Sequence, residues 1–353
     1  RALAAAPAPA PAPAPARADQ DGGNRGRARH AYAAIDLGTN NCRLLIAKPT
    51  ADGFFVVDAF SRVVRLGEGL GQSGRLSDAA MDRAVAALSI CADKLRRRHV
   101  ALARSVATEA CRKASNGAAF IERVYRETGI VLDIITAEEE ARLAVLGCHI
   151  LLEPGNGPAL IFDIGGGSTE LVLVDSSGPA PDILDWKSVP WGVVTLTESE
   201  SYNADERLAA YARMRDRVRQ GFADFAARLP AMAVTDRRLL GTSGTVTTLA
   251  SLHLDLPCYN RDAIDGLIVP SQSMRAISRR LAAMSLDERR LLPCIGKERA
   301  DLVVAGCAIL ESILDIWPAE RLGVADRGIR EGILRTLMGR DSAGTGRVGG
   351  ASA

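Results

Sequence analysis

Two short segments of the sequence carry acidic, glycine and hydroxyl residues in the same order. When residues 33–47 (AAIDLGTNNCRLLIA) are laid on residues 160–174 (LIFDIGGGSTELVLV) without a gap, Asp36 matches Asp163, and a glycine follows at the same distance in both. Each segment reads as an apolar strand, an Asp at its end, a turn of small residues and a second apolar strand, which is typical of a β-hairpin. We therefore predict a duplicated domain with an acid at each hairpin tip.

The turns between these strands have the composition of a phosphate-binding loop. Glycines at 165–167 have no Cβ, so the backbone can take positive φ and bring several N–H groups toward one anion. Thr39, Asn40, Ser168 and Thr169 add short side-chain donors. A pair of tight hairpins that bind nothing is the alternative, but two matching turns with an Asp at the same position favour a phosphate cleft.

The two copies differ at a position that affects metal binding. Where the first copy has Arg43, the second has Glu170, seven residues after Asp163. Across a hairpin these two carboxylates lie near each other, and a carboxylate about 5 Å from a phosphate oxygen repels it by roughly 3 kcal/mol at an effective dielectric constant of about 20. We therefore predict a divalent cation between these carboxylates and the phosphate. The expected ion is Mg²⁺, or Mn²⁺ in its stead, because Mg²⁺ takes one or two carboxylates, waters and phosphate oxygens.

The elements that must position these residues alternate along the chain. Short apolar, partly β-branched runs predict strands at 31–37, 43–48, 54–60, 62–66, 100–108, 130–135, 159–164, 169–174 and 238–241. Longer segments with apolar residues three and four apart predict helices at 78–98, 117–128, 138–152, 205–228, 272–283, 298–316 and 328–338. The alternation predicts an α/β fold.

Composition excludes several classes of protein. The chain has 353 residues, 47% hydrophobic and 24% charged, as in a globular protein of about two domains. Its net charge is only +2, with the surplus in the chain ends, so we expect no nucleic-acid partner. The longest apolar runs of the body have nine residues, against about 20 for a membrane span, so we expect no membrane segment. Seven widely spaced cysteines without a C-x-x-C pair predict buried, reduced thiols in a cytoplasmic protein.

Six segments together resemble one known family. They are AAIDLGTN (33–40), ATEACRKASNG (107–117), ITAEEEARL (135–143), DIGGGSTE (163–170), GTSGTVTTLASL (241–252) and ADRGIREGIL (325–334). In these residues the chain resembles the Ppx/GppA exopolyphosphatase and guanosine pentaphosphate phosphohydrolase family, within the acetate and sugar kinase, Hsp70 and actin superfamily. The resemblance implies two duplicated actin-like, ribonuclease H-like lobes with a cleft between them.

The resemblance also implies an activity and a set of site residues. The activity is metal-dependent hydrolysis that removes terminal phosphate from inorganic polyphosphate, or the 5′ terminal phosphate from guanosine pentaphosphate. Carried over position by position, Glu140 would be the general base, Arg112 a phosphate-binding arginine, and Asp163 and Glu170 the carboxylates that hold metal and water. The phosphate loops would comprise Asp36, Gly38, Thr39 and Asn40 in the first hairpin and Gly165, Gly166, Gly167 and Ser168 in the second.

From the residues alone, plainer roles stay open for two of these side chains. Glu140 follows Glu138 and Glu139 near a predicted helix N-terminus, where solvated acids also favour the helix dipole. Arg112 would otherwise be an exposed helical arginine. Another segment, 241–245 (GTSGT), nearly matches a nucleophile elbow but lacks the last glycine and a His to serve it. We instead predict that its residues contact substrate from the second lobe, namely Gly241, Ser243, Gly244 and Thr245.

The expected domain organisation follows from the tails and the repeat. Residues 1–30, rich in Ala and Pro, and residues 339–353, rich in Gly and Ser, are predicted to be disordered. The first lobe would span 31–136, joined by a C-terminal helix at 328–338, and the second lobe 137–327. Longer relatives carry an additional HD-type domain, and no His here is followed by Asp, so this chain resembles the short two-domain form.

Two other functions remain open at this point. One is a kinase of the same superfamily, which would need an adenosine pocket and an acceptor. The other is a nucleotide-binding sensor or actin-like assembly module without turnover. The sequence does not choose between polyphosphate and guanosine pentaphosphate, since both present a terminal anionic phosphate. It also leaves open a monovalent cation beside the divalent ion and a homodimeric assembly.

Overall fold

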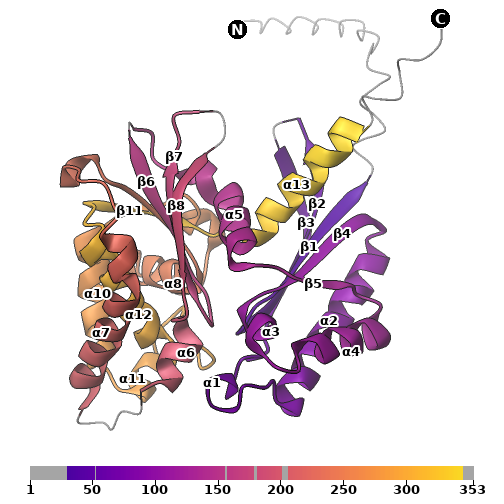
Figure 1. The fold of residues 1–353 in the computed structure, drawn as a ribbon, viewed down its shortest axis with the longest axis horizontal. Coiled ribbons are helices and arrows are strands. Elements are labelled where there is room, and N and C mark those ends of the chain that lie inside the picture. The colour runs from indigo at the N-terminus through magenta and orange to yellow at the C-terminus, as the bar shows by residue number, and fades with distance from the viewer. Residues whose placement is uncertain (1–29, 52, 156, 179–180, 201–205, 345–353) are drawn as a thin grey trace, which may run out of the picture.

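The computed structural model describes residues 30–344 except 52, 156, 179–180 and 201–205. Within these ranges the chain forms two mixed β-sheets flanked by helices, and the two halves of the chain lie side by side (Figure 1). The predicted tails fall mostly outside these ranges, at 1–29 and 345–353. The sheets meet at the ends of their first strands, where the sequence places the two hairpin tips.

The first sheet is built from the first part of the chain. Its strands are β1 (Ala31–Leu37), β2 (Asn41–Thr50), β3 (Gly53–Val63), β4 (Val100–Ala107) and β5 (Leu132–Ile134), in the order β3-β2-β1-β4-β5. Strands β1 to β3 form an antiparallel meander, and β4 and β5 continue in parallel on the other side of β1. The runs predicted at 54–60 and 62–66 are one strand up to Val63, because β3 keeps pairing with β2 through Arg62.

The second sheet repeats this topology. Its strands are β6 (Pro158–Ile164), β7 (Thr169–Asp175), β8 (Asp182–Val189), β9 (Arg238–Thr242), β10 (Ile268–Pro270) and β11 (Arg321–Ala325), in the order β10-β11-β9-β6-β7-β8. Strands β6 to β8 form the meander, β9 and β11 run parallel to β6, and β10 adds an edge. The shared order is the ribonuclease H-like arrangement, so the predicted duplication and the actin-like α/β fold are confirmed.

Helices cover both sheets. They are α1 (Leu70–Ser73), α2 (Asp78–Arg97), α3 (Glu109–Lys113), α4 (Gly117–Thr128), α5 (Ala137–Cys148), α6 (Val193–Glu198), α7 (Arg207–Ala226), α8 (Gly244–His253), α9 (Arg261–Ile264), α10 (Ser271–Ala283), α11 (Leu286–Arg290), α12 (Val303–Ile316) and α13 (Ile329–Gly344). Ser77 caps α2 by accepting a hydrogen bond from Ala80 N. Helix α13 extends to Gly344, so the prediction that the C-terminal tail is disordered from residue 339 is wrong as far as 344.

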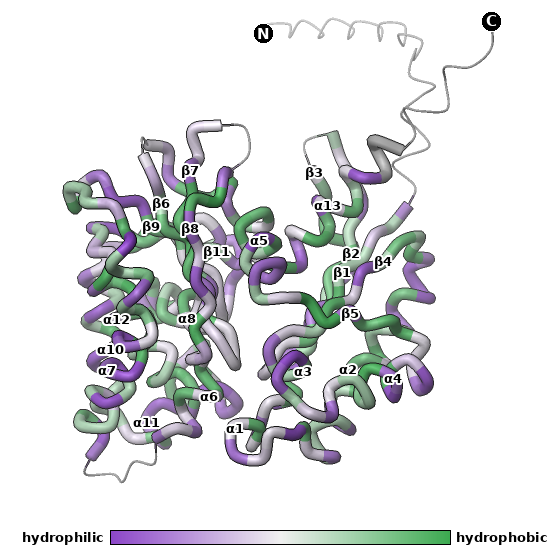
Figure 2. The backbone as a smooth tube through the Cα atoms, in the orientation of Figure 1, coloured by the Kyte–Doolittle hydropathy of each residue, from purple (hydrophilic) through white to green (hydrophobic). Residues whose placement is uncertain are grey.

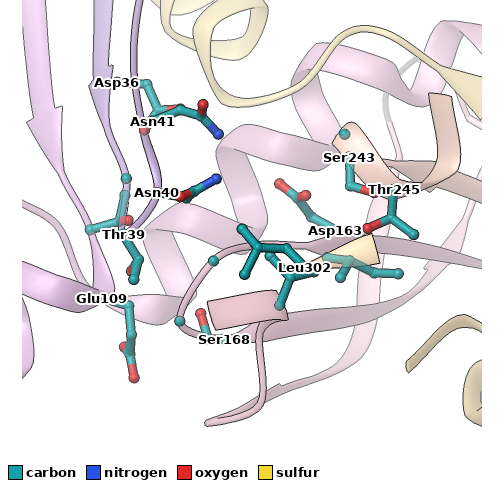
Figure 3. Close-up of a pocket in the computed structure, with 18 of the residues that line it drawn as sticks. Asp36, Thr39, Asn40, Asn41, Glu109, Asp163, Ser168, Ser243, Thr245 and Leu302 are labelled. Atoms are coloured by element: carbon teal, nitrogen blue, oxygen red, sulfur yellow. The ribbon is translucent and has the colours of Figure 1, made fainter. Parts of the chain in front are cut away.

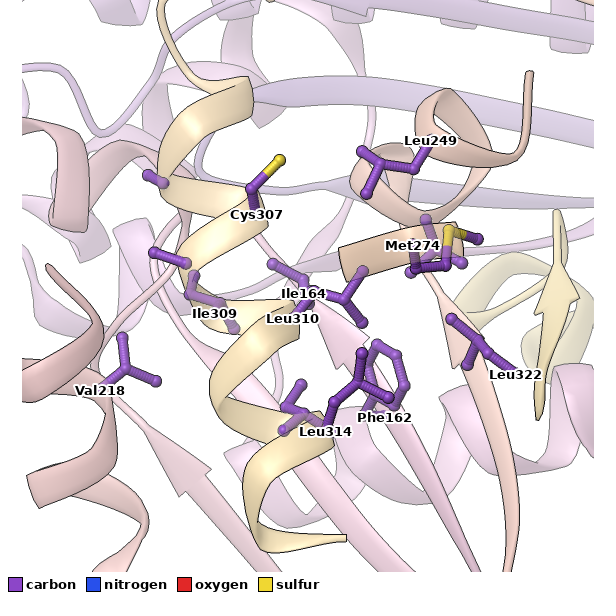
Figure 4. Close-up of a cluster of buried hydrophobic side chains, with 14 of the residues drawn as sticks. Phe162, Ile164, Val218, Leu249, Met274, Cys307, Ile309, Leu310, Leu314 and Leu322 are labelled. Carbon is purple, nitrogen blue, oxygen red and sulfur yellow. The ribbon is translucent and has the colours of Figure 1, made fainter. Parts of the chain in front are cut away.

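The largest core lies under the second sheet. Helix α12 is buried on nearly all sides, and its Leu310 and Leu314 lie near Phe162 of β6 in one apolar cluster (Figure 4). The surrounding helices differ in hydropathy: α8 is largely apolar, whereas α7 carries many hydrophilic residues on the outside (Figure 2). Helix α12 is hydrophobic all round because it is an inner helix, not because it enters a bilayer. In the described ranges, every helix is too short or too polar to cross a membrane.

The seven cysteines are free thiols, five of them buried, as the sequence predicts. They include Cys42 of β2 and Cys91 of α2. None is bridged, so the apolar clusters and not disulfides hold the two sheets and their helices together.

Helices α5 and α13 cross between the two sheets. Leu143 and Ala144 of α5 pack with Ile333 of α13 against the first sheet, while Ala141 and Val145 pack against the second. The helices approach closely at glycines: a Cβ at position 147 would overlap the Gly328 carbonyl oxygen, and one at position 332 would overlap the Leu143 carbonyl oxygen. Because α5 belongs to both cores, the predicted lobe boundary at residues 136 and 137 stays a prediction.

The α5–α13 crossing yields a stability prediction. The change Gly147→Ala should lower the free energy of unfolding by about 1–3 kcal/mol, because the new methyl group meets backbone that cannot move independently. The change Gly339→Ala in α13, where nothing lies within 4 Å of the new Cβ, should stabilise by up to about 1 kcal/mol. Urea unfolding measures both, and equal effects of the two changes would contradict the close crossing.

Candidate active site

The two hairpin tips meet and form the wall of a deep cleft. A Cβ at Gly166 would lie 2.9 Å from Thr39 Cβ and 3.0 Å from Asn40 N, so the second tip touches the first. The expectation of positive φ at residues 165–167 is wrong, since the glycines with positive φ lie elsewhere in the described chain. The missing side chains at Gly166 and Gly167 instead let the two tips approach each other.

Most of the residues predicted from the sequence line this cleft (Figure 3). From here on, "the cleft" means the pocket with these lining residues. The predicted ones that line it are Asp36, Gly38, Thr39, Asn40, Glu140, Asp163, Gly165, Gly166, Gly167, Ser168, Ser243, Gly244 and Thr245. Arg112, Glu170 and Gly241 do not line it. Gly241 lies in β9 under the Phe162 ring, which would be displaced by a Cβ at that position, so packing accounts for this glycine.

Several polar atoms of the first tip are buried without a hydrogen-bond partner. In the described part of the chain they are Oδ1 of Asp36, Oγ1 of Thr39, and Oδ1 of both Asn40 and Asn41. In Figure 3 these residues of the first tip lie on one side of the cleft, and the Asn40 amide points toward the Asp163 carboxylate of β6 on the other side. Buried polar atoms in proteins normally have a hydrogen-bond partner. Several unpartnered atoms gathered in one cleft therefore indicate that a polar ligand binds there.

Two carboxylates of the second tip, the half-buried Asp163 and the buried Glu170, lie directly across a β-ladder. Asp163 and Glu170 are register partners of β6 and β7, so both side chains point to the same side of the sheet. The Glu170 carboxylate accepts hydrogen bonds of 2.8 Å from Ser168 Oγ and from Ser188 Oγ. Burial, and then repulsion from Glu170, raises the pKa of Asp163 to about 8, and burial raises the pKa of Glu170 to about 7.

The donor set fits a divalent cation that is completed by its ligand. No group of three or more His, Cys, Asp or Glu side chains in the described residues is arranged to hold a metal ion. Asp163 and Glu170 provide two carboxylates, which is the number that Mg²⁺ takes from proteins when phosphate oxygens and waters fill its other positions. Their repulsion and their raised pKa values are expected at a site where a bound cation, and not a protein side chain, supplies the compensating positive charge.

The three consecutive glutamates at the start of α5 have different surroundings. Thr136 caps the helix by accepting a hydrogen bond from Glu139 N, which turns the next residue inward. Glu138 is exposed and Glu139 pairs with Arg104, whereas Glu140 is only 7% exposed and lines the cleft. Burial, followed by repulsion from Glu170, raises the pKa of Glu140 well above its usual value. The solvated-acid alternative is therefore wrong for Glu140.

Arg112 contacts Glu140 and not the cleft itself. From α3 its guanidinium donates to the Ile135 carbonyl oxygen at 2.7 Å, to the Glu140 carboxylate at 3.2 Å and to the Glu109 carboxylate at 3.1 Å through Nε. It is half-buried, so the alternative of an exposed arginine is wrong. In this arrangement Arg112 orients the Glu140 carboxylate, and its binding to phosphate stays a prediction.

Two arginines that line the cleft were not predicted. Arg43 of β2 and Arg299 before α12 approach the N-terminus of α8, where a Cβ on Gly244 would lie 4.0 Å from Arg43 Nη2 and 3.8 Å from Arg299 Nη1. Neither has an ion-pair partner among the residues that the structure describes. Burial, and then the charge of Arg43, lowers the pKa of Arg299. Two adjacent unpaired guanidinium groups at a helix N-terminus form a site for a polyanion.

Sequence signals for these residues were weak. Arg43 is the register partner of Asp36, as Glu170 is of Asp163, so the repeat itself marked the position as one that faces the cleft. Arg299 falls in the segment predicted as the start of a helix, but that helix begins at Val303. Glu109, another charged lining residue that was not predicted, lies in the short helix α3, which had no apolar period of its own.

A duplicated ribonuclease H-like fold with an acidic, hydroxyl-rich cleft between its tips is that of the actin-like class of phosphate-binding proteins. The chain belongs to the Ppx/GppA phosphatase family, whose model matches residues 45–341. It is 31% identical over 320 residues to exopolyphosphatase 2 of Mycobacterium tuberculosis, covering 87% of this chain and 98% of that protein. It is 27% identical over 306 residues to a putative exopolyphosphatase of Haemophilus influenzae, covering 86% and 90%. The crystal structure of the Aquifex aeolicus family member superposes with a TM-score of 0.73 at 27% identity, covering 88% of this chain and 98% of that one.

The raised pKa of Asp163 leads to a prediction for the metal-free protein. Its pKa of about 8 in the folded state exceeds that of an unfolded Asp, so stability falls as pH rises toward 8. The change Asp163→Asn removes this charge and should raise the free energy of unfolding at pH 9 by about 1–3 kcal/mol, since one pKa unit corresponds to about 1.4 kcal/mol.

Urea unfolding in the presence of a chelator, at pH 6 and pH 9, measures this effect. The control is Asp182→Asn, which changes an exposed carboxylate of β8 in the same way and should leave stability unchanged. Added Mg²⁺ should stabilise the parent more than Asp163→Asn. If Asp163→Asn were no more stable than the parent at pH 9, the Asp163 carboxylate would not be destabilised by burial and by repulsion from Glu170.

Proposed function

We propose that this protein is an exopolyphosphatase-type phosphohydrolase that releases terminal orthophosphate from inorganic polyphosphate by water attack. One observation carries the proposal: one cleft brings together the buried Glu140, the Asp163 carboxylate beside Glu170, and two arginines without an ion-pair partner in the described chain, Arg43 and Arg299. A base, a charge-neutralising centre and a polyanion site in one cleft match the needs of phosphoanhydride hydrolysis.

The reaction assigned to these groups is balanced as follows. The oxygen of a water molecule forms a bond to the terminal phosphorus, and the bond from that phosphorus to the bridging oxygen breaks. The bridging oxygen and its electron pair leave with the shortened chain. Glu140 orients the water and takes its proton, because burial keeps its carboxylate basic enough to do so near neutral pH. Arg112 keeps the Glu140 carboxylate aimed into the cleft.

The rest of the chain would be held by groups from both halves of the protein. Arg43 comes from β2 of the first sheet and Arg299 from the turn before α12 in the second half of the chain, and Ser243 and Thr245 add hydroxyl groups at the start of α8. Their charge suits consecutive phosphates more than a single orthophosphate. This part of the cleft would bind the leaving group. Changes here should therefore alter the affinity for the chain and not the positioning of the attacking water.

Asp163 and Glu170 would hold the divalent cation that we propose. When bound, Mg²⁺ or Mn²⁺ would neutralise charge on the terminal phosphoryl group. Ser168 and Ser188 hold the Glu170 carboxylate in place by two hydrogen bonds, so this side chain is positioned before any ligand arrives.

The names of the relatives support polyphosphate as the substrate. Both curated relatives described above are called exopolyphosphatases, one of them putatively. Guanosine pentaphosphate presents the same terminal group and is the alternative that the family name carries. Release of phosphate from long polyphosphate, short polyphosphate, guanosine pentaphosphate and ATP, each with and without Mg²⁺, tests the function and its substrate together. Release from none of them would end the proposal.

The base assignment predicts the effect of one isosteric change. Glu140→Gln keeps the shape and the hydrogen bonds to Arg112 but cannot take a proton, so kcat for polyphosphate should fall by about 10²–10⁴ with little change in KM. Glu138→Gln on the exposed face of α5 is the matched control and should keep the parent kcat. Steady-state phosphate release measures both, and an active Glu140→Gln enzyme would refute the base assignment.

The chain-binding assignment predicts a different kinetic effect. Arg43→Gln and Arg299→Gln should each raise KM for long polyphosphate by about 10-fold with a smaller change in kcat, because each removes one charge-assisted contact to the leaving group. Arg126→Gln, an exposed arginine of α4, is the control. A loss of kcat with unchanged KM would place these arginines at the reacting phosphate instead.

A further inference from the structure

One ion pair joins the two halves of the protein beside the cleft. Arg65, just after β3, contacts Asp301, just before α12, with two nitrogen atoms: Nη1 lies 3.0 Å from Oδ2, and Nη2 lies 3.3 Å from Oδ1. Nη2 also donates a hydrogen bond of 3.2 Å to the Glu298 carbonyl oxygen. Arg65 therefore holds both ends of the segment 298–301, which we call the Arg299 turn.

This turn carries one of the two arginines proposed to bind the polyphosphate chain. Arg299 lines the cleft, whereas Arg65 and Asp301 do not. The Arg299 side chain has no ion-pair partner among the residues that the structure describes, so the backbone of the turn sets where its guanidinium lies. Within the second half, Arg289 Nε donates to the Ala300 carbonyl oxygen at 2.9 Å. Arg65 adds a contact to the same turn from the first half.

The backbone of Arg65 is tied to the first hairpin tip. Arg65 N and Val64 N both donate to the Asn40 carbonyl oxygen, at 3.0 and 2.9 Å. Arg65 has a φ of 47°, a left-handed conformation that a residue with a Cβ rarely adopts. Arg83 stabilises this bend by donating to the Val64 and Arg65 carbonyl oxygens, at 2.8 and 3.2 Å. The Arg65 side chain thus reaches the second half from a segment that is fixed to the wall of the cleft.

Repulsion between the two cleft arginines gives this ion pair a role. Arg43 comes from the first half and Arg299 from the second, and a Cβ on Gly244 would lie 4.0 Å from Arg43 Nη2 and 3.8 Å from Arg299 Nη1. Like charges this close repel each other when no anion lies between them. Asp301 follows Arg299 by two positions, so its attraction to Arg65 opposes this repulsion between the same two halves.

We propose that Arg65 is a positioning residue for polyphosphate binding. Through its contacts to the Arg299 turn it holds Arg299 close to Arg43, so both guanidinium groups are in place before the chain enters the cleft. A site that is already in its binding arrangement loses less free energy to ordering when the ligand binds. The inference rests on the proposed function, because it takes polyphosphate as the ligand of the two arginines.

A second contact between the halves separates this role from a general one. Just before α1, Gly69 N donates to the Glu198 carboxylate of α6 at 2.9 Å, and Figure 1 shows α1 and α6 side by side. Glu198 is exposed, does not line the cleft and lies outside the Arg299 turn. Glu198→Ala is therefore a matched control, which removes a contact between the halves without touching that turn.

Steady-state kinetics on long polyphosphate test the assignment. Arg65→Gln and Asp301→Asn should each raise KM by about 3- to 5-fold and leave kcat within about two-fold, a modest effect because the pair is partly exposed. Asp301→Asn is the milder change, since Arg65 then keeps its backbone contacts to Asn40. Glu198→Ala should leave both constants within about two-fold of the parent. Thermal unfolding checks that each variant is folded.

A double-mutant cycle identifies the residue through which Arg65 acts. In the Arg299→Gln background, Arg65→Gln should raise KM by less than about 1.5-fold, because the guanidinium that it positions has been removed. Arg65→Gln combined with Asp301→Asn should raise KM no more than either change alone, since one change already breaks the pair. A merely structural disturbance would be independent of the side chain at position 299.

Three kinetic results would overturn the inference. Unchanged KM in both Arg65→Gln and Asp301→Asn would show that the pair does not affect chain binding. A full effect of Arg65→Gln in the Arg299→Gln background would show that it does not act through Arg299. Equal rises of KM in Glu198→Ala and Asp301→Asn would show that the pair only holds the halves together.

A binding measurement keeps this inference separate from the proposed function. Calorimetric titration with long polyphosphate, in the Glu140→Gln background to slow turnover, compares affinities with and without Arg65→Gln. We expect about 3- to 5-fold weaker binding with the added change. If the parent released no phosphate from polyphosphate, the proposed hydrolysis would fail, yet the titration would still decide the role of Arg65. Equal affinities would reject that role.

Discussion

The constraint on which this structure depends is the crowding of four carboxylates around one cleft, three of which line it while the fourth, Glu170, lies beside Asp163. Asp36, Glu140, Asp163 and Glu170 all have raised pKa values, with burial as the largest cause. In isolation such a cluster destabilises the fold, because each charge loses its hydration and repels the others. The cluster persists because it is built on central strands and a packed helix, which cannot move the acids into solvent. The cation and the phosphate ligand that we propose would supply the compensating charge and contacts.

The contact between the two halves of the protein also positions a residue of this cleft. Helix α5 packs on both sheets and carries Glu140, the proposed base, in its first turn, so contacts with both halves of the protein position this side chain. Glycines at two contacts make this closeness attainable: Gly147 at the α5–α13 crossing and Gly166 between the hairpin tips.

Much of the fold and many of the site residues could be predicted from local patterns. The repeat located both hairpins and their acids, and the strands and long helices followed from apolar periods. The predictions failed where the signal was not local. The half-exposed edge strand β8 and the three-residue β10 have little pattern, and the three glutamates of α5 look alike until the helix is packed. Arg112 was expected at the phosphate, but its neighbours Glu109 and Glu140 engage its guanidinium.

The sequence by itself determined the duplicated α/β architecture, the two acid-tipped hairpins and the phosphate chemistry, because strand alternation, turn residues and a repeat are written in neighbouring positions. Only the tertiary structure decided which arginines lie beside these hairpins. Arg43 and Arg299 are 256 positions apart in the chain, yet they converge at Gly244. It also decided that Glu109 would line the cleft and that the glycines of the second tip serve contact between the tips. Such pairings depend on how two separately folded sheets pack, and no periodicity along one strand or helix records that.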